Sequence, residues 1–227
     1  MVWSWQLWLS PRPAHRTNIA TQTKFTTAGN AAVYDFLTED DGSWGVRETH
    51  YIDSPITRAG LSGPPLHVHL FQDEYFTVEK GVLGVVTDSE THALTKADGT
   101  LKIKAGTRHR FWFHESSTED VVFRGWIDSQ DKDQGLDRDV LRNYQGYIVD
   151  CRKNNLEPSF FQLALIMYDA STILTPPFWM PLALLTGLNH VLARWIGQYL
   201  LGYVPDVIVL VLSFLPLVDL ELSFTAL

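Results

Sequence analysis

The sequence predicts an antiparallel β jelly roll followed by an apolar helical extension. Short runs rich in β-branched and aromatic residues recur between residues 29 and 128, and turn residues separate them at intervals of roughly eight to twelve positions. Beyond that range the apolar period changes from that of strands to that of helices. We therefore expect an irregular N-terminal arm over 1–28, a β-barrel over 29–128 and a helical, apolar extension over 129–227.

The individual elements follow from local composition. The arm carries Pro11 and Pro13 and then a Thr-rich patch, which predicts little regular structure. Strands are predicted at 31–37, 44–52, 67–69, 74–80, 82–88, 101–104, 108–113 and 120–127. Turns are predicted at 40–42 and 97–99, and Gly81 is expected in a tight turn that glycine tolerates more easily than other residues.

One amphipathic helix is predicted over residues 136–152. Its apolar residues recur at helical spacing, with charged residues on the other face. They are Leu136, Val140, Tyr144, Tyr147, Ile148 and Cys151. We expect this helix to pack on the outside of the barrel or across one of its mouths.

The chain from Phe160 onward is strongly apolar, which raises the question of membrane contact. Residues 175–193 approach the length of a membrane span, but three prolines interrupt their beginning. Residues 207–218 are too short to cross a bilayer, which needs roughly 20 helical residues. We expect helices that cover the barrel or form a homodimer interface, with peripheral membrane contact as the alternative.

Composition excludes several classes of function. The formal net charge of -8 disfavours nucleic acid as a partner. The single cysteine, Cys151, cannot form an internal disulfide, and the N-terminal run lacks the basic start of a signal peptide. These features predict an intracellular, cytoplasmic protein. A nucleophile elbow, a P-loop and a dinucleotide fingerprint are all absent from the sequence, which disfavours hydrolase, nucleotide and nicotinamide chemistry.

The chemistry is predicted to lie in the stretch 63–81. His67 and His69 alternate on a predicted strand, so both imidazoles leave the same face. Glu74 begins the next predicted strand and supplies a hard third ligand, and His109 is a fourth candidate. These four residues are the predicted metal ligands and catalytic residues.

The spacing of these residues resembles that of the cupin superfamily. The first cupin motif is matched at His67, His69, Glu74 and Gly81, and the second at Gly106 and His109. Three positions depart from the motifs without removing a ligand: Gly60 falls one place early, Lys104 replaces a proline and Phe113 replaces an asparagine. The resemblance implies a jelly-roll barrel that holds one divalent transition metal, with Fe or Mn expected first and Zn, Ni or Cu as alternatives.

Aromatic residues on the motif strands predict an apolar substrate pocket. The predicted lining residues are Tyr75, Phe76, Phe111 and Phe113. Strand alternation would put Phe111 and Phe113 on the face of His109 and turn Trp112 outward. His50 is a further candidate, since its strand could lie beside the motif strand and bring a general base to the pocket.

The chain from about Gly29 to Tyr203 resembles small single-barrel cupins with a C-terminal helical extension, most closely the cupin-domain oxidoreductases that accompany fungal polyketide synthases. Residues after Asp206 do not fit that pattern. This resemblance implies a dioxygenase-like, metal-dependent oxidoreductase acting on an aromatic or polyketide-derived small molecule in secondary metabolism. Two alternatives stay open. One is a cyclase, isomerase or dehydratase that uses the same pocket without redox chemistry, and the other is a non-catalytic binding or scaffold module.

Overall fold

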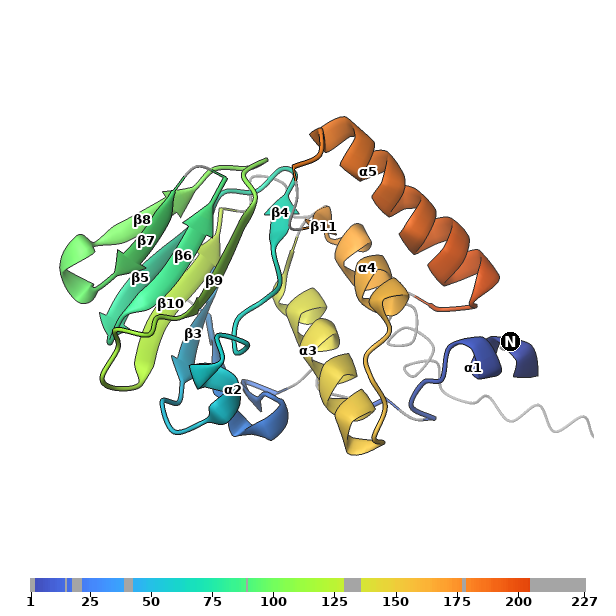
Figure 1. Ribbon diagram of the computed structural model, residues 1–227, viewed down its shortest axis with the longest axis horizontal. Coiled ribbons are helices and arrows are strands. Elements are labelled where there is room, and N and C mark those ends of the chain that lie inside the picture. Colours follow the sequence, from blue (N-terminus) through green and yellow to red (C-terminus); the bar gives the residue numbers. More distant parts are fainter. Residues whose placement is uncertain are drawn as a thin grey trace, which may run out of the picture.

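The computed structural model describes residues 3–14, 16–17, 22–38, 43–88, 90–128, 136–176 and 179–204. The predicted turn at 40–42 and the apolar run 207–218 lie outside these residues. Figure 1 shows the strands gathered on one side of the molecule and the long helices on the other, with β4 and β11 between them.

Two antiparallel sheets form the β part. The larger sheet has the order β1 (Lys24–Thr26), β2 (Ala32–Thr38), β3 (Trp44–His50), β10 (Val121–Ile127), β5 (Glu74–Lys80) and β8 (Thr100–Ile103). The smaller has the order β11 (Thr172–Leu174), β4 (His67–His69), β9 (His109–Phe113), β6 (Leu83–Thr87) and β7 (Thr91–Leu94). This arrangement confirms the predicted jelly roll with a helical extension.

The core lies between the two sheets and follows the alternation expected of strands. In β9, His109, Phe111 and Phe113 are buried while Trp112 and Arg110 on the other face are partly exposed. Gly81 connects β5 to β6 with a φ of 75°, and a Cβ there would lie 2.8 Å from the Asp120 carbonyl oxygen. The backbone conformation and the close contact together explain a glycine at this turn.

Helices flank the sheets. Short ones are α1 (Ser4–Leu9), η1 (Ala28–Asn30), α2 (Pro55–Arg58) and η2 (Lys96–Asp98). The extension contains α3 (Arg138–Lys153), α4 (Phe160–Asp169) and α5 (Leu182–His190), which continues as the π-helical segment η3 (Val191–Leu200). Within the described part of the chain, no helix has both the length and the hydropathy needed to cross a bilayer.

The prediction of an irregular N-terminal arm is wrong, because the arm contains α1 and β1. Phe25 of β1 is buried and its strand pairs with β2. The buried side chain of Gln6 in α1 donates a hydrogen bond of 2.8 Å to the carbonyl of Leu200. Elements this short are marginal alone, so long-range contacts stabilise them and local composition does not reveal them.

The helix α3 contacts both the larger sheet and α4. Its partly buried Leu141 and Val149 pack with the buried cluster that contains Tyr34 and Phe36. Its Tyr144, Tyr147 and Cys151 pack with Ile166 and Met167 of α4. Beyond α4 the chain adds β11 to the edge of the smaller sheet, next to β4. The extension therefore contributes a strand as well as helices to the β part of the molecule.

Candidate metal centre

Four buried side chains from three strands meet at one point. They are His67 and His69 of β4, Glu74 at the start of β5 and His109 at the start of β9. One ligand atom from each lies within 4.8 Å of the others, and each residue is at most 8% exposed. Register explains the meeting, because His67 lies directly opposite His109 in the β4–β9 pair. All four residues singled out from the sequence are thus brought together.

The outward-facing nitrogens of two rings are fixed by backbone carbonyls. Nδ1 of His67 lies 2.9 Å from the Pro65 oxygen, and Nδ1 of His109 lies 2.9 Å from the Thr107 oxygen. A carbonyl only accepts hydrogen bonds, so each Nδ1 carries a proton and donates it. Both rings therefore direct Nε2 toward the centre of the cluster.

The third ring is held by a hydroxyl from β11. Nδ1 of His69 lies 2.8 Å from Oγ1 of Thr172, and that hydroxyl donates its own proton to the Ala170 carbonyl at 3.1 Å. Oγ1 must therefore accept from Nδ1 of His69. In histidines that bind metals, a hydrogen-bond acceptor for the ring nitrogen that does not bind the metal fixes the tautomer and the orientation of the ring. Thr172 was not identified from the sequence, because 103 positions separate it from His69.

One nitrogen in the cluster is left without a hydrogen bond. Nε2 of His69 is buried and finds no hydrogen-bond partner among the described residues; its nearest acidic neighbour, Oε2 of Glu74, is 3.6 Å away. A buried lone pair without a partner is costly and needs an explanation. A divalent cation at the centre of these three imidazoles and one carboxylate would satisfy it, so the donor set fits a transition metal.

Without a cation, a proton links Glu74 to His109. Oε2 of Glu74 lies 2.6 Å from Nε2 of His109. Burial acts to raise the pKa of Glu74, but the hydrogen bond with His109 and the electrostatic interaction with His109 and His69 outweigh it and hold that pKa well below its ordinary value. Burial acts to lower the pKa of His109, yet the bond and charge of Glu74 raise it. His67 differs, since burial and its two histidine neighbours lower its pKa.

A small cavity of about 70 Å³ lies beside this cluster, and the barrel and the extension share its wall. The barrel contributes Tyr34, Glu48, Pro64, His67, His69, Glu74 and Phe111; the remainder of the chain contributes Leu136, Leu141, Tyr144, Gln145, Met167 and Leu174. Of the two positions expected for the amphipathic helix, α3 thus takes the one across a mouth of the barrel. There Leu141, Tyr144 and Gln145 of α3 form part of the cavity wall.

The predicted pocket residues lie in three different environments. Phe111 is on the cavity wall. Phe76 and Phe113 belong to the hydrophobic core between the sheets. Tyr75 is a correction: alternation from Glu74 turns it to the opposite face of β5, where its ring stacks on Trp126 with centroids 5.3 Å apart.

Glu48 was missed by sequence reasoning and is the acidic group of the cavity wall outside the metal cluster. Its Oε2 lies 2.9 Å from Nε2 of His50, whose Nδ1 lies 2.7 Å from Oγ of Ser62. Tyr34 lies opposite Glu48 in the β2–β3 pair, and its hydroxyl accepts a hydrogen bond of 3.2 Å from Nε2 of Gln145. Burial raises the pKa of Glu48 despite the opposing effect of His50. The predicted base His50 lies on β3, which pairs with β2 and β10 and not with β4. It does not line the cavity, and its hydrogen bond to Glu48 links it to the cavity wall. An available signal was the alternation of Glu48 and His50 on one predicted strand.

Comparison with known proteins gives close relatives among fungal enzymes. A scan of family-wide sequence profiles finds no match. "Probable oxidoreductase virH" of Hypocrea virens is 53% identical over 206 residues, covering 91% of this chain and 94% of that protein. "Oxidoreductase iacF" of Pestalotiopsis fici is 56% identical over 205 residues, covering 89% and 100%. "Epoxidase atD" of Aspergillus terreus is 33% identical over 201 residues, covering 82% and 62%.

Solved structures with a similar arrangement are distant. The cupin domain of Schizosaccharomyces pombe Cnp3 matches with a TM-score of 0.34 and 10% identity, over 63% of this chain and 81% of that one. A cupin-like protein of Thermotoga maritima matches with a TM-score of 0.34 and 12% identity, over 53% and 80%. Likeness at this level carries no conclusion about activity.

Replacement of Thr172 by valine is expected to weaken metal binding while preserving the fold. Valine keeps the shape of threonine but cannot accept the Nδ1 proton of His69, and loss of such a partner typically lowers metal affinity by about 10- to 100-fold. Competition with a chromophoric chelator would measure the change for Zn²⁺ or Co²⁺. Thr91→Val, at an exposed position on β7, is the matched control. Equal affinities for Thr172→Val and Thr91→Val would contradict the role given to this hydroxyl.

Metal binding is expected to release a proton, and the number released should fall as pH rises. The raised pKa of His109 keeps its ring charged at pH 6, and that proton must leave before Nε2 can bind a cation. Titration calorimetry with Zn²⁺ in two buffers of different ionisation enthalpy should give a larger proton release at pH 6 than at pH 9. Metal affinity therefore increases with pH across this range. Glu74→Gln should reduce the release near pH 7, because it removes the charge that raises the His109 pKa. A release independent of pH would refute the shared proton.

Proposed function

The chain belongs to the family of fungal oxidoreductases that includes virH and iacF, and from this premise we propose that it is a metal-dependent, cupin-type oxidoreductase of secondary metabolism. Its substrate in this proposal is an aromatic or polyketide-derived small molecule. The observation that carries the proposal is the set of three imidazoles, each with Nδ1 occupied by an outward hydrogen bond, around one carboxylate.

His67, His69, His109 and Glu74 would hold the ion. A divalent iron or manganese bound there would supply redox chemistry with O₂, whereas zinc, nickel or copper are the alternatives that the same donors accept. The protein's part is to fix four donors in a dry site. The buried hydrogen bonds to Pro65, Thr107 and Thr172 keep the rings from turning, so little reorganisation is needed when substrate binds.

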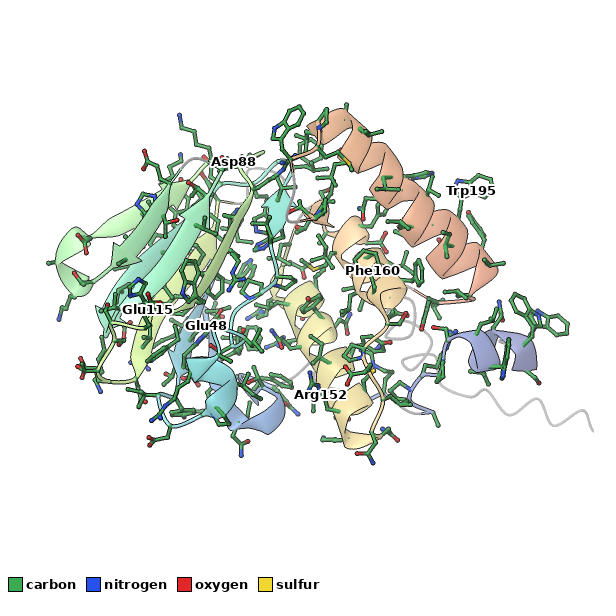
Figure 2. All side chains as sticks on the ribbon, in the orientation of Figure 1. Glu48, Asp88, Glu115, Arg152, Phe160 and Trp195 are labelled. Atoms are coloured by element: carbon green, nitrogen blue, oxygen red, sulfur yellow. The ribbon has the colours of Figure 1, made fainter. Side chains whose placement is uncertain are left out.

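The cavity wall divides into a polar side and an apolar side. Glu48 with Tyr34 lies on the larger sheet, while Leu141 and Met167 of the extension face the cavity from the helices. Figure 2 shows Glu48 among the strands and Phe160 on α4 in the helical part. A substrate with an ionisable hydroxyl is oriented by such a wall, because its oxygen is drawn to the metal and to Glu48 and its carbon frame to the apolar side.

Glu48 also supports a second candidate function without redox chemistry. Its carboxylate can accept a proton from a bound hydroxyl or an acidic carbon; the O–H or C–H bond breaks, its electron pair stays on the substrate, and the proton remains on Oε of Glu48. The hydrogen bond with His50 holds the carboxylate at the cavity. A cyclase, isomerase or dehydratase needs such a group, and an anaerobic assay separates it from the oxidoreductase.

Substitution of a metal ligand is expected to remove the ion and turnover together. Wild-type protein should carry about one transition metal per chain by elemental analysis, and His67→Ala and Glu74→Ala should carry almost none, since each loses one of four donors. Oxygen uptake with a panel of phenols and catechols should fall in parallel. His92→Ala, which changes a partly exposed histidine on β7, is the control. Full turnover by metal-free protein would rule the proposal out.

Replacement of Glu48 by glutamine is expected to change proton uptake without releasing the metal. 4-Nitrocatechol is a suitable probe, because its visible spectrum distinguishes its ionisation states. On metal-loaded wild-type protein near pH 7 it should bind fully deprotonated, and on Glu48→Gln it should keep one proton until a higher pH, because the amide cannot take that proton. Glu119→Gln, at a half-exposed carboxylate paired with Lys80, is the control. Identical spectra for Glu48→Gln and wild type would remove Glu48 from the reaction.

A further inference from the structure

A second, larger cavity lies between the rim of the barrel and the helical extension. It has a volume of about 420 Å³ and a mainly apolar wall. Leu66 lines it from the barrel side, Phe160 and Leu163 from α4, and Leu185 and Leu188 from α5. We call this space the tail cavity. The tail cavity is not part of the jelly-roll core, because none of its lining residues belongs to the buried hydrophobic cluster between the two sheets.

The tail cavity adjoins the metal cavity through shared residues. Tyr144 and Leu174 line both spaces, and the neighbouring Pro64 and Pro65 line one each. Leu174 lies directly opposite His67 in the pairing of β11 with β4. The side chains of Tyr144 and Leu174 therefore lie between the two cavities, next to β4, the strand that carries His67 and His69. A molecule bound at the cluster could extend into the tail cavity without crossing the core.

The sizes of the two cavities differ in a way that constrains the ligand. The tail cavity is about six times larger than the space of about 70 Å³ beside the cluster. The smaller space accommodates the oxygenated end of a molecule but little more. Most of the bulk of any sizeable ligand must lie elsewhere, and the adjoining apolar space is suited to hydrocarbon.

One polar group of the tail cavity lacks a partner, which also points to a ligand. Oγ1 of Thr175 is buried and has no hydrogen-bond partner among the described residues, and Thr175 lines the tail cavity. A buried polar group of this kind is uncommon in a finished core and is typical of sites that fix the orientation of a bound molecule.

We propose that the tail cavity binds the unbranched hydrocarbon chain of an amphiphilic substrate whose oxygenated head group lies at the metal cluster. This inference rests on the proposed function for the head group and adds the chemical class of the remainder: a phenol, catechol or enol that carries a linear alkyl or alkenyl chain. Leu174 and Tyr144 then lie beside the junction between head and chain, and α4 and α5 cover the chain.

A chain-length series tests the proposal on the full-length, metal-loaded protein. The probes are 4-alkylcatechols from methyl to octyl, and calorimetry gives each dissociation constant. Each added methylene that is fully buried should tighten binding by about fourfold, and the gain should stop once the cavity is filled. Equal affinity along the series would overturn the proposal.

Two substitutions on α5 separate the tail cavity from the general apolar surface. Leu188→Trp places an indole at the cavity wall, where Leu188 is 41% exposed, whereas Leu184→Trp makes the same change at a position of that helix that is 60% exposed and does not line the cavity. Leu188→Trp should abolish the gain per methylene and leave the affinity of 4-methylcatechol within about twofold of wild type. Leu184→Trp should keep the fourfold steps. A gain per methylene that survives in both variants would mean that the chains bind elsewhere, and the proposal would fall.

The same series on His67→Ala distinguishes this inference from the proposed function. If metal-free His67→Ala binds every probe more weakly but keeps the gain per methylene, the tail cavity stands whatever the metal does. If wild-type protein holds metal and binds 4-methylcatechol but shows no gain with chain length, the proposed function survives and the tail cavity fails.

Discussion

The pairing of the three-residue strand β4 with β9 on one side and β11 on the other is the constraint on which the candidate site depends. All three residues of β4 are buried, and its register places His67 opposite His109 and His69 opposite Thr172. Because side chains alternate along a strand, a shift of one position would direct Val68 to the cluster and both imidazoles away from it. The two neighbouring strands prevent that shift, and β11 also supplies the acceptor for His69.

The cluster is costly for the fold in the absence of a cation. Three imidazoles and a carboxylate are buried together, with one unpaired nitrogen and one proton shared between Glu74 and His109. Replacement of such a group by apolar residues is often neutral or stabilising, so stability alone does not account for it. Glu48 and His50 of β3, on the opposite sheet, form a second buried polar chain with Ser62 of the connection between α2 and β4. The two groups meet at a cavity that the helices cover, and this concentration of polar groups with unfavourable burial is typical of functional sites.

The sequence is sufficient to predict the jelly roll and the group of His67, His69 and Glu74, because strand alternation and short spacing are local properties. His109 lies 35 positions after Glu74 and is predicted from its match to the second cupin motif. The strand β5 was predicted with its observed bounds, Glu74–Lys80. Three features depended on long-range pairing and were not predicted: the strand β1, the strand β11 with Thr172, and the adjacency of Glu48 to the cluster. Tyr75 does not lie in the pocket, because Glu74 fixes the alternation of β5 and aromatic composition alone does not show which face of a strand a residue occupies. The tail cavity depends on how α4 and α5 pack, which helical periodicity alone does not determine.

The position of β11 has a consequence for modularity. The strand β11 follows α3 and α4 in the sequence and pairs with β4, which carries His67 and His69. The barrel and the extension therefore cannot be exchanged between relatives as independent domains. A chimera joined just after β10 would combine one parent's imidazoles with the other parent's hydroxyl acceptor and cavity roof. Recombination within this family should therefore be tolerated best where the crossover keeps β4 and β11 from the same parent. Divergence in substrate preference should proceed by coordinated changes in the barrel and in the extension, on both sides of the β4–β11 pair.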